Sequence, residues 1–272
     1  MPLDCSRSCV VIYRKLYCSI MKFASIGSGS KGNCTVISNN STSLLVDCGF
    51  SLKQTTARLE RLNMNPQDID AVLVTHEHDD HWSGVRALCM KYEIPIYLSA
   101  GTYRAVNDRC LGPINLVDTE VPFTIGGFKI LGITVPHDAL EPLQYVFETN
   151  SLRFGLLTDL GHLTPYIFEH YSCLDALFLE ANHDELMLAE GMYPSFLKAR
   201  ISGNWGHLSN SQAIDFVNKI DHARLQHLVF GHISDRNNCR SVLKKLVNQT
   251  SGILGKVHYA NYEYGSDWIE II

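Results

Sequence analysis

The chain has 272 residues, of which 46% are hydrophobic and 19% are charged. These values are typical of a globular protein and exclude a disordered, collagen-like or coiled-coil chain. Lysine and arginine together number 23 against 28 acidic residues, so the formal net charge of −5 provides no overall basic field for nucleic acid. Any contact with a polyanion must therefore be local.

The nine cysteines are an odd number and contain no C-x-x-C pair, which argues against a disulfide framework and a cysteine zinc site. No apolar run approaches the roughly 18 residues of a membrane helix, and Arg14 and Lys15 interrupt the run near the N-terminus. We therefore expect a cytoplasmic protein that makes no membrane contact.

Residues 1–20 show no periodic pattern, whereas a strand-like run begins directly after Met21. We expect 1–20 to lie outside the folded core, either because translation starts near Met21 or because they form a true extension. Residues 21–272 are expected to form a single domain.

Apolar and β-branched runs bounded by Gly, Asn or Pro predict ten strands, at 22–26, 34–37, 43–46, 71–75, 95–98, 128–135, 144–148, 152–158, 174–180 and 226–230. Helical patterns lie between them, at 51–63, 82–92, 163–170, 194–201, 209–220 and 236–248. Ser209 is a plausible N-cap of the 209–220 helix. Because strands precede, separate and follow the helices, a layered α/β sandwich is favoured over a purely parallel doubly wound sheet.

The predicted strand 71–75 leads directly into His76-Glu77-His78-Asp79-Asp80-His81. A turn at the end of a strand can aim His76 and His78 at one point, and Asp80 and His81 at a neighbouring point. Open α/β sheets place their sites at such strand ends. Neutral imidazoles together with a carboxylate suit Zn²⁺, Fe or Mn²⁺ better than Ca²⁺ or Mg²⁺.

This segment resembles the metallo-β-lactamase superfamily, whose H-x-H-x-D-H signature it matches in full. The further landmarks of that superfamily also follow predicted strands, in the expected order: Asp47, His137, Asp159 and His232. The resemblance covers about residues 47–232. It implies a four-layer αββα sandwich with two metal ions in a cleft at one sheet edge.

The resemblance also implies a role for each landmark. The first metal would be held by His76, His78 and His137, and the second by Asp80, His81 and His232. Asp159 would bridge the two ions and Asp47 would brace the ligand loop, which agrees with the need of two close cations for a shared anion. The ions would be Zn²⁺ or Mn²⁺, with Fe as a further option.

Two more histidines are candidates for chemistry. Gly206-His207-Leu208-Ser209-Asn210 is similar to the His-Ser-Thr element of superfamily phosphodiesterases, in which a histidine protonates the leaving oxygen, although Leu208 interrupts the pattern. We expect His207 to be catalytic together with Asp80 and Asp47. His183, after a predicted strand, is a candidate for phosphate contact. Capping or surface roles are the alternatives for both histidines.

Charge is unevenly distributed along the chain. Residues 191–260 contain nine Lys plus Arg against three Asp, which is a local charge of +6. Candidates for a phosphate track are Lys198, Arg200, Arg236, Arg240, Lys244 and Lys245. A solvated helix surface is the alternative explanation.

The segments Ser28 to Cys34 and Asn182-His183-Asp184, taken with the motifs above, resemble the YycJ/WalJ branch of the superfamily, which is described as metal-dependent nucleases. The resemblance implies a dinuclear phosphodiesterase that cuts nucleic acid, DNA more than RNA, as a 5′-to-3′ exonuclease. The alternatives are an RNA-processing or cyclic-phosphate phosphodiesterase and a glyoxalase-II-like thioester hydrolase. A redox di-iron protein is disfavoured because His78 stands where redox relatives carry Glu. The oligomeric state stays open.

Overall fold

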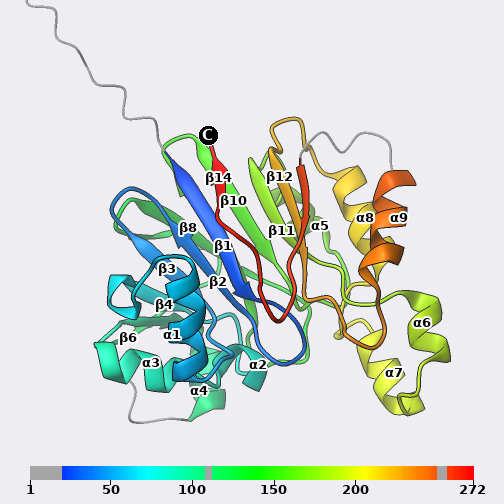
Figure 1. Cartoon of the computed structure of the whole chain (residues 1–272), viewed down its shortest axis with the longest axis horizontal. Helices are drawn as coiled ribbons and strands as arrows, with labels where there is room; N and C mark the ends of the chain where they lie inside the picture. Colours follow the sequence, from blue (N-terminus) through cyan, green and yellow to red (C-terminus); the bar gives the residue numbers. More distant parts are fainter. Residues whose placement is uncertain (1–19, 108–111, 250–255) are drawn as a thin grey trace, which may run out of the picture.

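The computed structural model describes residues 20–107, 112–249 and 256–272, which form two seven-stranded sheets (Figure 1). The first sheet has the order β14-β1-β2-β3-β4-β5-β6 and contains β1 (Met21–Gly27), β2 (Cys34–Ser38), β3 (Ser43–Val46), β4 (Ala71–Leu73), β5 (Ile96–Leu98), β6 (Ile114–Leu116) and β14 (Ile269–Ile271). The second has the order β13-β12-β11-β10-β9-β8-β7 and contains β7 (Phe123–Ile125), β8 (Phe128–Thr134), β9 (Leu143–Thr149), β10 (Leu152–Leu157), β11 (Ala176–Glu180), β12 (His227–Gly231) and β13 (Lys256–Tyr259).

Each sheet is antiparallel in one half and parallel in the other. Strands β3 to β6 pair in parallel, and so do β10 to β13. Parallel neighbours need crossover connections, which supply most of the helices. Their carboxyl ends also meet at one edge, where the segments that follow β3, β4, β10, β11 and β12 converge.

Helices cover the outer faces of the sheets. The longer ones are α1 (Leu52–Arg61), α3 (Val85–Tyr92), α8 (Asn210–Lys219) and α9 (Arg240–Gln249). The short ones are η1 (Pro66–Asp68), α2 (Asp79–Trp82), α4 (Ala100–Val106), α5 (Pro165–His170), α6 (Glu185–Glu190) and α7 (Ser195–Ile201). Figure 1 shows the sheets in the centre, with α1 on the left and α8 and α9 on the right.

Three buried clusters separate the four layers. The cluster between the sheets includes Phe23 of β1 and Phe154 of β10, whose rings stack with centroids 4.2 Å apart. A second cluster joins the first sheet to α1 and α3 through residues such as Leu59. The third joins the second sheet to α5, α8 and α9 and includes Phe216 and Leu243. Burial on both faces of each sheet explains the apolar runs of the sequence, and the predicted αββα sandwich is confirmed.

All ten predicted strands are present, and Ser209 caps α8 by accepting the N–H of Gln212 at 3.2 Å. Sequence patterns missed β6, β7, β13 and β14, which are three or four residues long and lie at or beside sheet edges. They also missed α2, α4 and α6, and the predicted helix 82–92 is α3, which begins three residues later, at Val85. Strands this short carry too little alternation to stand out.

The expectation for residues 1–20 lies, apart from Ile20, outside the described residues. Strand β1 begins at Met21, and the domain boundary there stays a prediction. Among the described residues, no helix combines the length and the apolar content that a membrane crossing requires.

Candidate metal site

The predicted ligands gather at the carboxyl edge of both sheets. Three residues that end strands there have left-handed backbones: Asp47 after β3 (φ 61°), Asp159 after β10 (φ 55°) and His232 after β12 (φ 50°). Residues other than glycine adopt this conformation rarely, and it concentrates at functional sites where the surrounding structure imposes it. The backbone at this edge is therefore shaped to aim these side chains inward.

The signature segment leaves β4 and forms the short helix α2, where the sequence predicted an irregular turn. His81 and Trp82 N–H groups both donate to the carbonyl of His78 at 2.9 Å, which starts the helix. The loop after β3 packs against this helix so closely that a Cβ on Gly49 would collide with the carbonyl of Asp80. Glycine at 49 therefore allows the loop after β3 to approach α2.

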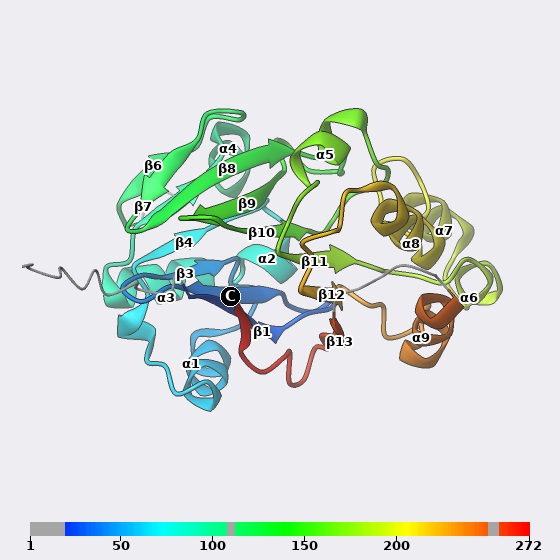
Figure 2. The ribbon, with the colours of Figure 1, turned by 90° about the horizontal axis from the view of Figure 1, so that it is seen from above.

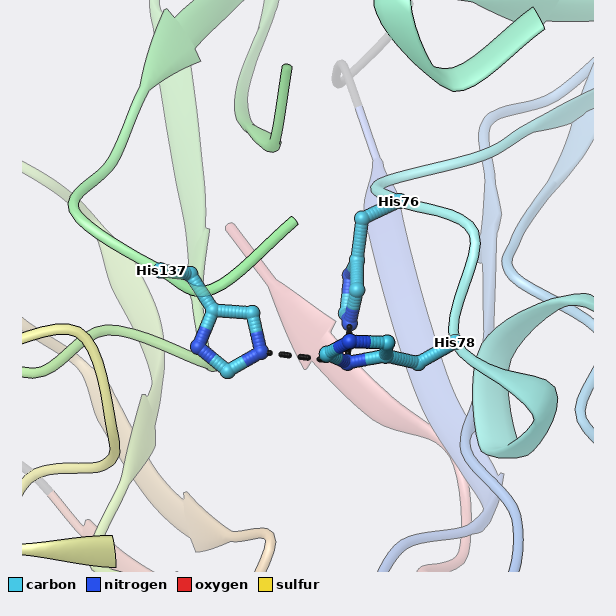
Figure 3. Close-up of side chains that lie close together, drawn as sticks. All are labelled: His76, His78 and His137. Atoms are coloured by element: carbon cyan, nitrogen blue, oxygen red, sulfur yellow. Dashed lines mark hydrogen bonds between the residues drawn. The ribbon is translucent and has the colours of Figure 1, made fainter. Parts of the chain in front are cut away.

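Three imidazoles converge on one point at the start of this segment, as Figure 3 shows. Nδ1 of His78 lies 3.1 Å from Nε2 of His76 and 3.3 Å from Nε2 of His137. The ring of His137 is held from behind, because its Nδ1–H donates to the carbonyl of Gly206 at 3.0 Å. Three ring nitrogens at this separation cannot all be satisfied by one another, since each neutral ring has a single N–H.

A second group lies beside the first. Asp80 Oδ2 is 3.4 Å from His81 Nε2 and 3.6 Å from His232 Nε2. Behind it, His81 Nδ1–H donates to Asp47 Oδ2 at 2.7 Å, and the N–H and hydroxyl of Thr75 also donate to Asp47. Asp47 thus holds the His81 ring so that Nε2 faces Asp80. This is the arrangement that carboxylates behind metal-bound histidines adopt.

Asp159 stands between the two groups and is 2% exposed. Its Oδ2 lies 3.3 Å from His81 Nε2, and its Oδ1 lies 3.1 Å from His232 Nδ1. Ligand atoms of Asp159, His81 and His76 lie within 4.8 Å of one another. Oδ2 has no hydrogen-bond partner although it is buried, and a buried carboxylate oxygen normally has one.

The electrostatics of the two groups differ. Burial, with the nearby charge of His81, holds the pKa of His76 well below its ordinary value, and burial also lowers the pKa of His137. Both rings are therefore neutral at physiological pH. A neutral ring offers a nitrogen lone pair, which is the form that binds a cation.

In the second group the carboxylates dominate. Burial alone would lower the pKa of His81, but the charges of Asp159 and Asp80 raise that pKa well above its ordinary value. Burial alone would raise the pKa of Asp159, but His232 and His81 hold that pKa well below its usual range. A concentration of buried negative charge must be balanced by protons or by a bound cation. The converging nitrogens, these carboxylates and the unpartnered Asp159 oxygen together fit divalent metal binding.

Sequence patterns missed Glu180, the last residue of β11, which is fully buried. Its Oε1 accepts from His232 Nδ1 at 2.7 Å and from His207 Nδ1 at 2.9 Å, while its Oε2 accepts the N–H of Leu208 at 2.9 Å. Burial alone would raise its pKa, but His207 and the hydrogen bonds from both rings lower that pKa to about 2. Glu180 is thus a charged anchor that links the metal group to His207.

Asn33 was also missed, because its loop carries no nucleotide-binding pattern. Its Nδ2 lies 3.2 Å from Asp80 Oδ2, while its Oδ1 accepts from Gly29 N–H at 2.9 Å and from the Ser28 hydroxyl at 3.1 Å. Ser28 Oγ in turn accepts the N–H of His232 at 2.8 Å. The Gly-rich loop between β1 and β2 therefore contacts the candidate metal site at both Asp80 and His232.

A cleft of about 340 Å³ opens over these groups. It is lined by Ser30, His78, Asp79, Asp80, Asp159, Asn182, Tyr193, Leu197, Arg200, Ile201, His207, His232 and Ser234. Arg200 is the one cation of the predicted phosphate track in this lining, and its Nε donates to Asp138 Oδ2 at 2.5 Å. His207 lies at the cleft with its ring centroid 5.2 Å from those of both His137 and His232.

The other five cations of the predicted track, and His183, lie outside the lining of the cleft. Lys198 directs its Nζ to the carbonyl of Ala189 at 2.6 Å. His183 is 2% exposed, and its backbone carbonyl accepts the N–H of Asn210 at 2.8 Å. Its buried Nδ1 has no hydrogen-bond partner, and burial lowers the pKa of its ring. The placement of both side chains therefore gives no support to the predicted phosphate contacts.

An αββα sandwich with converging histidine and aspartate side chains at its carboxyl edge is the arrangement of a class of metallohydrolases. Residues 42–233 match the family model of the beta-lactamase superfamily domain, which is more than half of the chain, so the protein belongs to this superfamily of hydrolases. The chain is 33% identical over 235 residues to exodeoxyribonuclease YycJ of Bacillus anthracis, covering 84% of this chain and 88% of that protein.

A second relative, exodeoxyribonuclease WalJ of Streptococcus pneumoniae, is 34% identical over 235 residues, which cover 84% of this chain and 87% of that protein. Among solved structures, the metallo-beta-lactamase fold protein YhfI of Bacillus subtilis superimposes with a TM-score of 0.71 at 18% identity. That superposition covers 93% of this chain and 99% of YhfI, and it shows the shared fold.

Proposed function

We propose that the protein is a dinuclear metal-dependent phosphodiesterase that hydrolyses nucleic acid, with DNA as the substrate and 5′-to-3′ exonuclease action. The observation that carries the proposal is the pair of ligand groups joined by the buried Asp159, with His207 at the same cleft. The names of the two relatives, both exodeoxyribonucleases, support the choice of DNA.

The first ion would be held by His76, His78 and His137, the second by Asp80, His81 and His232, with Asp159 shared. Divalent ions in such a pair supply an activated water at neutral pH and neutralise the charge on phosphoryl oxygens. Zn²⁺ and Mn²⁺ are the proposed ions, because the donor set combines imidazole with carboxylate.

His207 is the proposed general acid for the departing sugar oxygen. Its Nδ1–H is held by Glu180, so Nε2 is the ring nitrogen left for the substrate. A proton supplied at that atom would neutralise the alkoxide as the bond to phosphorus breaks. Arg200 is the proposed phosphate ligand, because Asp138 holds its Nε and leaves the terminal nitrogens of the guanidinium for phosphate oxygens.

The described cysteines are all free thiols, which supports the proposed cytoplasmic location. Nucleic acid in that compartment is the proposed partner, and no membrane partner is proposed.

A substrate panel tests the function. Metal-reconstituted protein is incubated with duplex DNA, single-stranded DNA, RNA and a thioester, beside a His76→Ala variant. We expect loss of a 5′-terminal label from DNA as a mononucleotide at the earliest times and a shortening ladder from a 3′-terminal label. Cleavage of the thioester alone would overturn the substrate class, and equal cleavage by wild type and variant would show a contaminating nuclease.

A further inference from the structure

One segment beside the cleft exposes large apolar side chains. In the stretch 185–205, which includes α6 and α7, Leu186, Met192, Phe196 and Trp205 are 72%, 101%, 76% and 61% exposed. No residue of α7 is buried. Both views place α6 and α7 with α8 and α9 at one end of the molecule (Figures 1 and 2). A concentration of exposed apolar groups on a soluble protein marks an interaction surface.

This surface is fixed relative to the metal site. The N–H of His207 donates to the carbonyl of Ile201 at 2.9 Å, so the end of α7 is tied to the proposed general acid. Gly206 lies in the same turn and accepts from His137, and a Cβ there would collide with the carbonyls of Arg200 and Ile201. A group bound on α7 would therefore keep a defined distance from the ions.

The two exposed rings flank the proposed phosphate ligand in the sequence. Phe196 is four residues before Arg200, so the two are neighbours on the surface of α7. The carbonyl of Trp205 accepts the N–H of Asp138 at 3.0 Å, and Asp138 holds Arg200. Tyr193 continues the surface into the cleft, with Arg236 over its ring at 5.8 Å. Aromatic rings beside guanidinium groups match the alternation of base and phosphate along a nucleic-acid strand.

We propose that Phe196 and Trp205 form a stacking wall for the bases of an unpaired strand whose scissile phosphate lies in the cleft. The inference rests on the proposed function and names its substrate class, namely nucleic acid with a single-stranded or frayed end. A base inside a duplex has both faces covered by its neighbours, so a strand along which successive bases stack on the wall must be unpaired. Continuity with the cleft and the two arginines favour a nucleic acid over an apolar partner.

Binding measurements test the wall apart from catalysis. Metal-loaded protein is titrated with a labelled single-stranded oligonucleotide whose phosphorothioate linkages resist hydrolysis, and with an abasic strand of equal length and charge. Wild type should prefer the strand with bases. Trp205→Ala and Phe196→Ala should each weaken binding of the strand with bases about tenfold, because one stacked base is lost. The affinity of each variant for that strand should therefore approach its affinity for the abasic strand. Trp205→Phe keeps a ring and should retain most of the preference.

Tyr264→Ala is the matched control, since Tyr264 is 70% exposed and lies between β13 and β14, outside the stretch 185–205. Equal binding of both strands by wild type, absence of binding, or unchanged affinity in both alanine variants would overturn the wall. Light scattering gives a further test. The wall would also be overturned if the wild-type protein formed a dimer that the alanine variants dissociate while their affinity for the strand stays unchanged. Wild type that prefers the bases but cleaves no phosphodiester would keep the wall and refute the proposed function, whereas cleavage without base preference would do the reverse.

Discussion

Two regions at the cleft are built in opposite ways: its floor, formed by buried carboxylates and the histidines that contact them, and the exposed wall beside it, formed by α7 and Trp205. On the floor, Asp47, Asp159 and Glu180 are 3%, 2% and 0% exposed, and each contacts at least one histidine ring. On the wall, no residue of α7 is fully buried, and the rings of Phe196 and Trp205 are exposed. A change on the floor must therefore disturb a packed network, while a change on the wall alters what the surface can bind. We therefore expect changes on the floor to affect the chemistry and changes on the wall to affect the binding of substrate.

The largest effect is expected at His207, which is bonded both to Glu180 on the floor and to the end of α7 on the wall. We expect His207→Ala to lower kcat on DNA by about 10²- to 10⁴-fold, the usual contribution of a general acid, with the bound metal unchanged. Steady-state kinetics and elemental analysis measure the two quantities. His162→Ala is the control, because that ring bonds to the carbonyl of Asn204 and lies outside the cleft lining. Loss of metal from His207→Ala would place this histidine among the ligands instead.

A smaller effect is expected at Glu180, which supports both His207 and His232. The Glu180→Gln variant keeps the shape of the side chain but loses the charge that accepts from the two rings. We expect metal affinity and kcat to fall by about 10- to 100-fold, as for other carboxylates behind metal-bound histidines. Competition with a chelator measures the affinity.

Glu148→Gln is the control for that variant, since its carboxylate pairs with Arg153 and Lys129 on β10 and β8, away from the cleft. If Glu180→Gln bound metal and turned over DNA as wild type does, the buried charge of Glu180 would serve folding alone. The proposal that the floor supports metal binding and catalysis through this charge would then be wrong.

The sequence was sufficient for the strands that carry the floor. Long apolar runs end at Asp47, Asp159 and His232, so both the strands and the residues after them could be predicted. Whether those residues bind metal stays a prediction. Glu180 also ends such a run, but its importance depends on rings that are 27 and 52 residues away, and no local pattern reveals that meeting.

The wall was beyond prediction for a different reason. Sequence gives the type of a side chain but not its direction, so Lys198 and Arg200 were equivalent candidates for phosphate. In the structure Lys198 reaches back to the carbonyl of Ala189, while Arg200 lines the cleft. The four exposed apolar residues of 185–205 are of the types that also fill the core, and only the fold shows that they are exposed.

The different placements of Lys198 and Arg200 give the prediction with the smallest expected effect. Arg200→Gln removes a cation at the cleft, so binding of DNA should weaken severalfold for every sequence, and the slope of log K against log salt should fall by about one. Lys198→Gln removes the same charge from the same helix outside the cleft and should leave the slope unchanged. Fluorescence anisotropy over a series of salt concentrations measures both. If the two variants lost affinity equally, the helix would act through its overall charge, and phosphate would not be positioned by the ion pair of Arg200 with Asp138.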